Sequence, residues 1–164
     1  MKFERYGNGI AKGLSVTLKT LFSHPTVSQY PEQRLHTSQR IRGNELVWDI
    51  KKCTGCGTCA KNCPQGVIEI NTSTNMIDNK YEVEKYQVDT GYCIQCGLCV
   101  ESCPYGALFM GYSYEKAKYR RGELIQSKED MALGEKQPSG YFYPEIAAEL
   151  PRQTLLVERI TEDE

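Results

Sequence analysis

Residues 52–70 read KCTGCGTCAKNCPQGVIEI, and residues 92–110 read YCIQCGLCVESCPYGALFM. The second stretch repeats the first, because all four cysteines align and Pro64 aligns with Pro104. Each copy has the pattern C-x₂-C-x₂-C-x₃-C-P, and the two copies contain all eight cysteines of the 164-residue chain. These stretches decide the fold, since the rest of the chain has to be arranged around them.

The cysteine spacing is typical of proteins that hold two [4Fe–4S] clusters. Three cysteines two residues apart surround one cube, and the fourth lies beyond a turn of helix and ligates the other cube. The pattern therefore predicts two crossed ligand sets. Cluster A takes Cys53, Cys56, Cys59 and Cys103, and cluster B takes Cys93, Cys96, Cys99 and Cys63. The expected cofactors are two [4Fe–4S] clusters, with these eight cysteines as the metal ligands.

Two other uses of cysteine compete with this interpretation. A disulfide framework would spread its bridges through the chain, but no cysteine follows Cys103. A Cys₄ zinc site uses paired C-x₂₋₄-C motifs, and a tetrahedral ion does not need a third cysteine at the same spacing. The alternative from another class is thus a structural adaptor held together by zinc, which metal analysis would distinguish from an iron–sulfur protein.

Composition excludes several other functions. The formal net charge is −1, so no basic field favours nucleic acid, and the basic run 116–121 is interpreted as a partner-facing helix face. No apolar run approaches the ~18 residues of a membrane-spanning helix, and MKFERYGNG is not a signal pattern. Without a G-x-G-x-x-G or P-loop motif, we expect no directly bound nucleotide and no catalytic residue on this chain.

The repeat predicts an α+β fold with a two-cluster, bacterial ferredoxin-like core over 46–110. Each half contains a leading strand, a cysteine loop, a turn of helix that ends at Cys-Pro, and a trailing strand. The leading strands are expected at 46–50 and 87–89, and the trailing strands at 67–70 and 107–110. The insertion between the halves is expected to open with a turn-rich stretch, 71–75, and to continue as a hairpin strand at 81–86.

The flanks predict segments that lie on partners. Residues 9–23 have an apolar stripe at helical spacing, which predicts an amphipathic N-terminal helix. The stripe is equally consistent with an ordinary core-facing helix and with one that lies on a membrane surface or a membrane subunit. The expected domains are 1–45 (this helix and an extended partner-binding segment), 46–110 (the cluster domain) and 111–164 (a partner-wrapping extension). Short polar helices are expected at 114–121 and 123–133, followed by an extended C-terminal tail over 134–164.

The flanks also carry a resemblance. The segments GLSVTLKTLF (13–22), Thr26, YPE (30–32) and RIRG (40–43) are similar to the N-terminal signature of one family. The second cysteine motif followed by GYSYEKAKYRR (111–121) is similar to the same family's second motif. From residue 9 to about residue 130, the chain resembles the ferredoxin-like iron–sulfur subunit of respiratory complex I.

This resemblance implies a function and partners. The family's subunit belongs to a quinone oxidoreductase that drives proton translocation, and it passes electrons from an upstream cluster chain to the terminal cluster beside the quinone site. By this resemblance cluster A is the upstream member of the pair and cluster B the downstream one. The implied partners are an upstream iron–sulfur subunit, the terminal-cluster subunit and a membrane subunit. The implied location is peripheral, on the cytoplasmic face of a prokaryotic inner membrane.

Three related functions remain open on the sequence alone. The chain could serve as the equivalent iron–sulfur subunit of a membrane-bound hydrogenase or of a formate hydrogenlyase, or act as a free ferredoxin. Long flanks without a core of their own argue against free diffusion. The electron donor is open among NADH, ferredoxin, F420, formate and hydrogen, because 71–86 and the tail depart from the family pattern.

Overall fold

A computed structural model describes residues 7–23, 27–43, 45–75, 80–134 and 136–155. Thr26 of the N-terminal signature and the end of the predicted tail, 156–164, lie outside the described residues. The chain divides into two compact units, and the first consists of residues 1–36 with 154–164. The second unit, 37–153, contains both cysteine motifs. No described helix is long and apolar enough to cross a bilayer.

Two small antiparallel sheets form the centre of the second unit. Strand β1 (Leu46–Trp48) pairs with β4 (Leu108–Met110), and β2 (Ile68–Asn75) pairs with β3 (Lys80–Asp89). The first strand of one repeat is thus joined to the last strand of the other, and the reverse. A short strand, β5 (Ile125–Ser127), extends the second sheet along β3. The four strands predicted from the repeat are confirmed, and their cross-pairing brings the two cysteine loops together.

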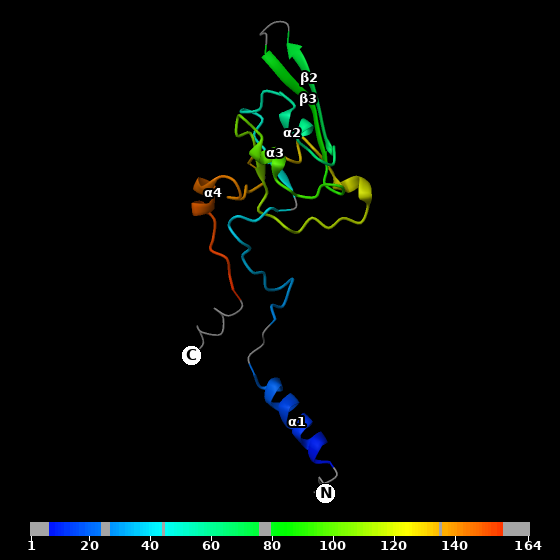
Figure 1. The fold of residues 1–164 in the computed structure, drawn as a ribbon, viewed down its shortest axis with the longest axis vertical. Helices are drawn as coiled ribbons and strands as arrows, with labels where there is room; N and C mark the ends of the chain where they lie inside the picture. The colour runs from blue at the N-terminus through cyan, green and yellow to red at the C-terminus, as the bar shows by residue number, and fades with distance from the viewer. Residues whose placement is uncertain (1–6, 24–26, 44, 76–79, 135, 156–164) are drawn as a thin grey trace. The chain divides into compact units, whose positions relative to one another are not determined.

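The insertion is a long hairpin. Strands β2 and β3 rise above the short helices α2 (Thr58–Lys61) and α3 (Leu98–Glu101) in Figure 1. The predicted strand at 81–86 is confirmed as part of β3. The prediction of a turn-rich stretch at 71–75 is wrong, because β2 continues through it. Threonine and its polar neighbours suit a strand when a partner strand supplies the backbone hydrogen bonds, and a register shift between Asn71 and Thr72 accommodates the extra residue.

Both faces of the β1–β4 sheet are buried. Leu46 and Trp48 belong to the core around the cysteines, and the alternation of a strand places Val47 on the opposite face. Phe109 of β4 packs against the ring of Tyr143, with centroids 4.8 Å apart. The C-terminal segment therefore covers the second face of this sheet, which explains why 37–153 forms one compact unit across the boundaries expected at 45 and 110.

The two polar helices predicted after the second motif are wrong. Residues 114–120 contain no helix, and a 3₁₀ turn, η1 (Arg121–Leu124), leads directly into β5. The tail also departs from the extended prediction, since α4 (Pro144–Glu149) forms a short helix and packs with Ala147 and Leu150 nearly inaccessible to solvent. Tertiary contacts determine the conformation of these segments, because helix propensity alone is a weak guide. In particular, residues 125–127 form a strand because the edge of β3 is available for pairing.

The described part of the first unit contains one long helix. Helix α1 (Asn8–Leu21) covers most of the predicted 9–23; it begins one residue earlier and ends two residues earlier. Its N-terminus has no side-chain cap, and none of its residues is buried. The apolar stripe is solvent-exposed throughout: Ile10 72%, Leu14 64%, Leu18 57% and Leu21 74%. A 14-residue helix that contains Gly9 and Gly13 is marginal in water by itself, so a surface that covers the stripe would stabilise it.

Glu45 is a buried charge that joins three segments of the second unit. Only 2% of its side chain is exposed, and Lys116 and Lys136 place their ammonium groups 2.8 and 3.0 Å from its Oε2. We expect Glu45→Gln to destabilise the unit by about 2 kcal/mol, because two cations lose the carboxylate that compensates them. A lower urea midpoint for the loss of visible absorbance would report this. Glu69→Gln, which removes an exposed ion pair with Lys85, should change the midpoint little.

Candidate metal centre

Each cysteine loop enters its helix through a glycine with positive φ. Gly57 (φ 71°) precedes α2, and Gly97 (φ 84°) precedes α3. Glycine adopts this left-handed conformation without the steric cost that other residues carry. The chain therefore turns sharply after the second cysteine of each motif, so that the loop curls around a space. One turn of helix then carries the fourth cysteine away from its own loop.

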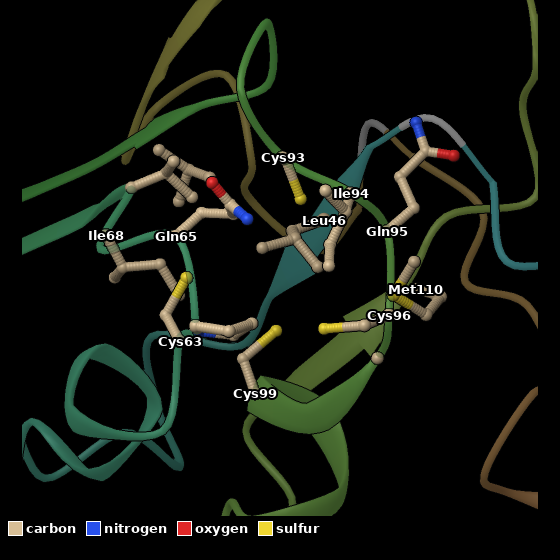
Figure 2. Close-up of a pocket in the computed structure, with 14 residues that line it drawn as sticks. Leu46, Cys63, Gln65, Ile68, Cys93, Ile94, Gln95, Cys96, Cys99 and Met110 are labelled. Atoms are coloured by element: carbon tan, nitrogen blue, oxygen red, sulfur yellow. The ribbon is translucent and has the colours of Figure 1, made fainter.

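Four cysteines from both repeats line the first cavity, called cavity B. They are Cys93, Cys96 and Cys99 of the second motif and Cys63 of the first. Figure 2 shows their sulfur atoms directed toward a common space, with Leu46, Ile68 and Met110 around them. The wall of this cavity is almost entirely apolar. The fourth cysteine of the first motif thus lies with the loop of the second, as the spacing predicts.

The second cavity, called cavity A, has the reciprocal set. It is lined by Cys53, Cys56 and Cys59 of the first motif and by Cys103 of the second. All eight cysteines are free thiols. Among the described residues, no three His, Cys, Asp or Glu side chains converge as a site for a single metal ion. Each set of four sulfurs surrounds a space, which is the arrangement that a cube of iron and sulfide requires, with one thiolate to each iron.

The two cavities have matching walls. Each cysteine of the first repeat lies forty residues before its counterpart in the second. Most residues that line cavity A are likewise forty positions away from a residue that lines cavity B. The chemistry of the walls differs, however. Cavity A has Trp48 and Tyr86 where cavity B has Val88 and Leu46. Cavity A also has Thr54 where cavity B has Ile94, so its wall carries more polar groups.

Burial governs the protonation of the thiols. It raises the pKa of Cys99 to about 12, and the neighbouring thiols Cys93 and Cys59 add to the effect. Burial also raises the pKa of Cys59, against a lowering by the Tyr86 hydroxyl. Cys59 and Cys99 belong to different sets, so their mutual influence places the two cavities side by side. Buried thiolates become stable beside a cationic centre, and the donor set therefore fits iron.

Hydrogen bonds reach several sulfurs in cavity A. The Tyr86 hydroxyl lies 3.7 Å from the Cys59 Sγ, and the backbone N–H of Ala107 donates to the Cys103 Sγ at 3.4 Å. The hydroxyl of Thr58 lies 3.3 Å from the Cys56 Sγ and lowers the pKa of that thiol. Such bonds orient ligands and stabilise negative charge on sulfur, so they also tune a bound cluster.

Arg42 and Tyr141 cover the outside of the second cysteine loop. The guanidinium of Arg42 donates to the Cys96 carbonyl at 3.2 Å and lies 5.3 Å from the centre of the Tyr141 ring. The Tyr141 hydroxyl in turn donates to the Glu101 Oε1 at 2.6 Å. The N-terminal and C-terminal flanks thus support the site itself, at residues that the cysteine pattern does not indicate.

Gly97→Ala is expected to damage cavity B selectively. A Cβ at Gly97 would lie 2.6 Å from the Cε1 of Tyr141, whereas a Cβ at Gly57 would lie 3.7 Å from the nearest atom, in Ile70. Both variants bear the left-handed strain of about 1–2 kcal/mol, but only the first also displaces a ring. The EPR signal of the cluster in cavity B should therefore fall in Gly97→Ala, together with the iron content, while the signal of the cluster in cavity A is retained. In Gly57→Ala both signals should be better retained. Equal losses would contradict the role of Tyr141.

Trp48 and Tyr86 are wall residues that analysis of the cysteine motifs alone does not find. Their difference from the other half is visible in the sequence of the leading strands. There the repeat alignment pairs Trp48 with Val88 and Tyr86 with Leu46. Their rings pack with centroids 5.0 Å apart, and both residues are 2% exposed. Extending the comparison of the halves beyond the cysteines would have identified them.

Comparisons with known proteins agree with this site. A family model described as a 4Fe-4S dicluster domain matches residues 52–107. Subunit 9 of the NADH-quinone oxidoreductase of Thermus thermophilus is 37% identical over 133 residues, which are 76% of this chain and 73% of that protein. Subunit I from Carboxydothermus hydrogenoformans is 37% identical over 79% of this chain and 93% of its own length.

One solved structure is also similar. It is a chain of the membrane-bound sulfane sulfur reductase, described as an archaeal respiratory membrane complex, with 32% sequence identity and a TM-score of 0.49. The match covers 66% of this chain and 56% of that one.

The family model and the curated relatives identify the cofactors and the family. The dicluster domain contains all eight cysteines, so the chain binds two [4Fe–4S] clusters, as the cysteine spacing predicts. The relatives at 37% identity align well beyond that domain, over more than three quarters of the chain. The chain belongs to the family of subunit I of the NADH-quinone oxidoreductases.

Proposed function

We propose that this chain is the electron-relay subunit of a membrane-associated quinone oxidoreductase of the complex I type. The main observation in support is the pair of adjoining cavities, each lined by four cysteines that come from both repeats. When bound there, each [4Fe–4S] cluster takes up and releases one electron. The chain's own contribution is to hold two such carriers close together behind apolar walls that keep water from the sulfurs.

The ligand sets follow from the same cavities. Cluster A is held by Cys53, Cys56, Cys59 and Cys103, and cluster B is held by Cys93, Cys96, Cys99 and Cys63. Electrons enter through cluster A from an upstream iron–sulfur subunit and leave through cluster B toward the terminal-cluster subunit at the quinone site. The exposed Ile94 and Leu98 on the loop around cavity B provide an apolar exit surface for that partner.

The chain is held at the cytoplasmic face of the membrane as a peripheral subunit. Helix α1 supports this placement, since its apolar stripe is exposed and needs a surface to cover it. Proton translocation takes place in other subunits of the complex. Long flanks distinguish it from a freely diffusing ferredoxin, and a hydrogenase or formate hydrogenlyase would differ in its partners.

Affinity purification of the full chain under anaerobic conditions tests the proposal. We expect eight iron and eight sulfide per chain, about four of each per cube, together with a terminal-cluster subunit and membrane subunits of a quinone-reactive complex. Reduction of added quinone by the isolated complex should follow reduction of both clusters. Isolation of a free, monomeric chain from membranes and cytosol alike would contradict the proposal, and co-purification with a hydrogenase large subunit would favour the second function.

A further inference from the structure

Trp48 brings an unexplained polar atom to cavity A. Its side chain lines the cavity and is 2% exposed. The indole Nε1 is buried and has no hydrogen-bond partner among the described residues. An indole N–H can only donate, and proteins rarely bury such a donor without an acceptor. The acceptors that this cavity is built to receive are sulfur atoms.

The backbone holds Trp48 firmly in this place. Its N–H donates to the Met131 carbonyl at 2.7 Å, and its carbonyl accepts from the Leu133 N–H at 2.8 Å. On the other side β1 pairs with β4, where Trp48 lies opposite Leu108. With both strand edges fixed, the backbone of Trp48 cannot move outward, and its side chain is only 2% exposed to water. A group bound in the cavity is therefore placed to supply the missing acceptor.

Tyr86 supplies a second donor beside the first. Its hydroxyl points to the Cys59 Sγ at 3.7 Å, and its ring packs on the Trp48 ring. A phenol is protonated at neutral pH, and beside a negatively charged sulfur its hydroxyl acts as a hydrogen-bond donor.

The matching positions of the other cavity lack both donors. Val88 occupies the place of Trp48, and Leu46 occupies the place of Tyr86. Packing requirements alone do not explain this difference, since aliphatic residues build an equivalent wall in cavity B. Cavity B has different polar neighbours: Gln65 and Gln95 line it, and the exposed Arg42 donates to the Cys96 carbonyl. The two repeats thus differ in how charge on a bound cube is stabilised.

We propose that Trp48 and Tyr86 donate hydrogen bonds to the sulfurs of the cluster in cavity A and raise its reduction potential. Reduction adds one negative charge to a cube, and donors directed at its sulfurs stabilise that charge. Both donors keep their protons throughout, so the step involves only the electron. The inference rests on the proposed ligand sets and concerns positioning residues, because neither side chain is itself a ligand.

Conservative replacements in the full, cluster-loaded chain test the inference. Tyr86→Phe removes only the hydroxyl. Trp48 is the single tryptophan, so it can be replaced during biosynthesis by 3-benzothienylalanine, which substitutes sulfur for the N–H at nearly constant volume. Tyr105→Phe is the matched control, because this half-exposed tyrosine lines the same cavity and makes no hydrogen bond to a sulfur in the described part of the chain.

EPR-monitored redox titration supplies the main readout. The midpoint potential of one cluster should fall in both donor variants, the same cluster in each, while the other cluster and the Tyr105→Phe control stay unchanged. Unchanged potentials in both donor variants would overturn the inference, as would equal shifts of both clusters. Iron and sulfide content, measured on the same samples, reports failure of cluster binding separately from failure of the inference.

A spectroscopic readout does not depend on any variant. Labelling the chain with indole-¹⁵N tryptophan places one ¹⁵N atom in the chain, at Trp48. Pulsed EPR on the partly reduced protein should then show ¹⁵N coupling on the signal of the cluster that Tyr86→Phe shifts. Coupling to the other cluster only, or to neither cluster, would place the N–H elsewhere and overturn the role of Trp48.

Discussion

Cys63→Ser is expected to destroy the cluster of the second motif and to spare that of the first. Cys63 lies in the first motif, yet its sulfur lines cavity B with Cys93, Cys96 and Cys99. Substitution should therefore abolish or convert the same EPR and Mössbauer signals that Cys93→Ser affects. Cys63→Ala should act identically, which excludes rescue by a serine oxygen.

Cys103→Ser is the reciprocal variant, and it should affect the cluster of the first motif. Cys103 lies in cavity A with Cys53, Cys56 and Cys59, so Cys103→Ser should affect the signals that Cys53→Ser affects. With crossed ligand sets each cube would bridge the two repeats, so either loss should also lower stability markedly, because metal-binding free energy contributes directly to folding. If Cys63→Ser instead altered the Cys53 signals and spared those of Cys93, the crossed ligand sets would be wrong.

Leu14→Asp combined with Leu18→Asp is expected to release the subunit from the membrane with its iron content unchanged. Burial of two leucines contributes about 3–6 kcal/mol, so their loss should weaken docking roughly 10²- to 10⁴-fold. Membrane fractions would be washed and probed for the subunit, and iron would be measured on the released protein. The cluster unit, 37–153, is compact without α1, which is why the clusters should survive.

The opposite face of α1 supplies the matched control. Val16 and Thr20 have the same four-residue spacing and lie away from the stripe, so Val16→Asp with Thr20→Asp adds the same charge to the same helix. This control should remain on the membrane. Release by both double variants would point to loss of the helix itself, and release by neither would show that the stripe packs against the subunit's own chain.

The sequence was most informative where chemistry depends on local spacing. The crossed cysteine sets are predicted from the two residues that separate successive cysteines and from the helical turn before the fourth. Both are short-range constraints. The strands around each motif were also predictable, since apolar runs flank the cysteine loops. The pairing of β1 with β4 is a long-range contact that brings the two repeats together. It is consistent with the repeat, but it cannot be predicted from the sequence of either strand alone.

The sequence was least informative after residue 110. The stretches 114–121 and 123–133 have helical composition. However, Lys116 forms an ion pair with the buried Glu45, and residues 125–127 pair with the edge of β3 as a strand. The tail looked too polar to bury much, yet Gly140 lets the chain approach Ala147 closely enough that a Cβ would collide with it. Such close contacts depend on distant partners, so composition within a window cannot reveal them.

The position of β1 has a consequence for how the protein is made. Trp48 lies between β4 and the segment at Met131–Leu133, both of which are synthesised later. At about 5–20 residues per second, a ribosome needs roughly 4–17 s to pass from Trp48 to Ala132. During this interval the first cysteine loop has been translated without its neighbouring wall. A complete cavity A, with Cys103 and both neighbours of Trp48 in place, therefore exists only after most of the chain has been synthesised.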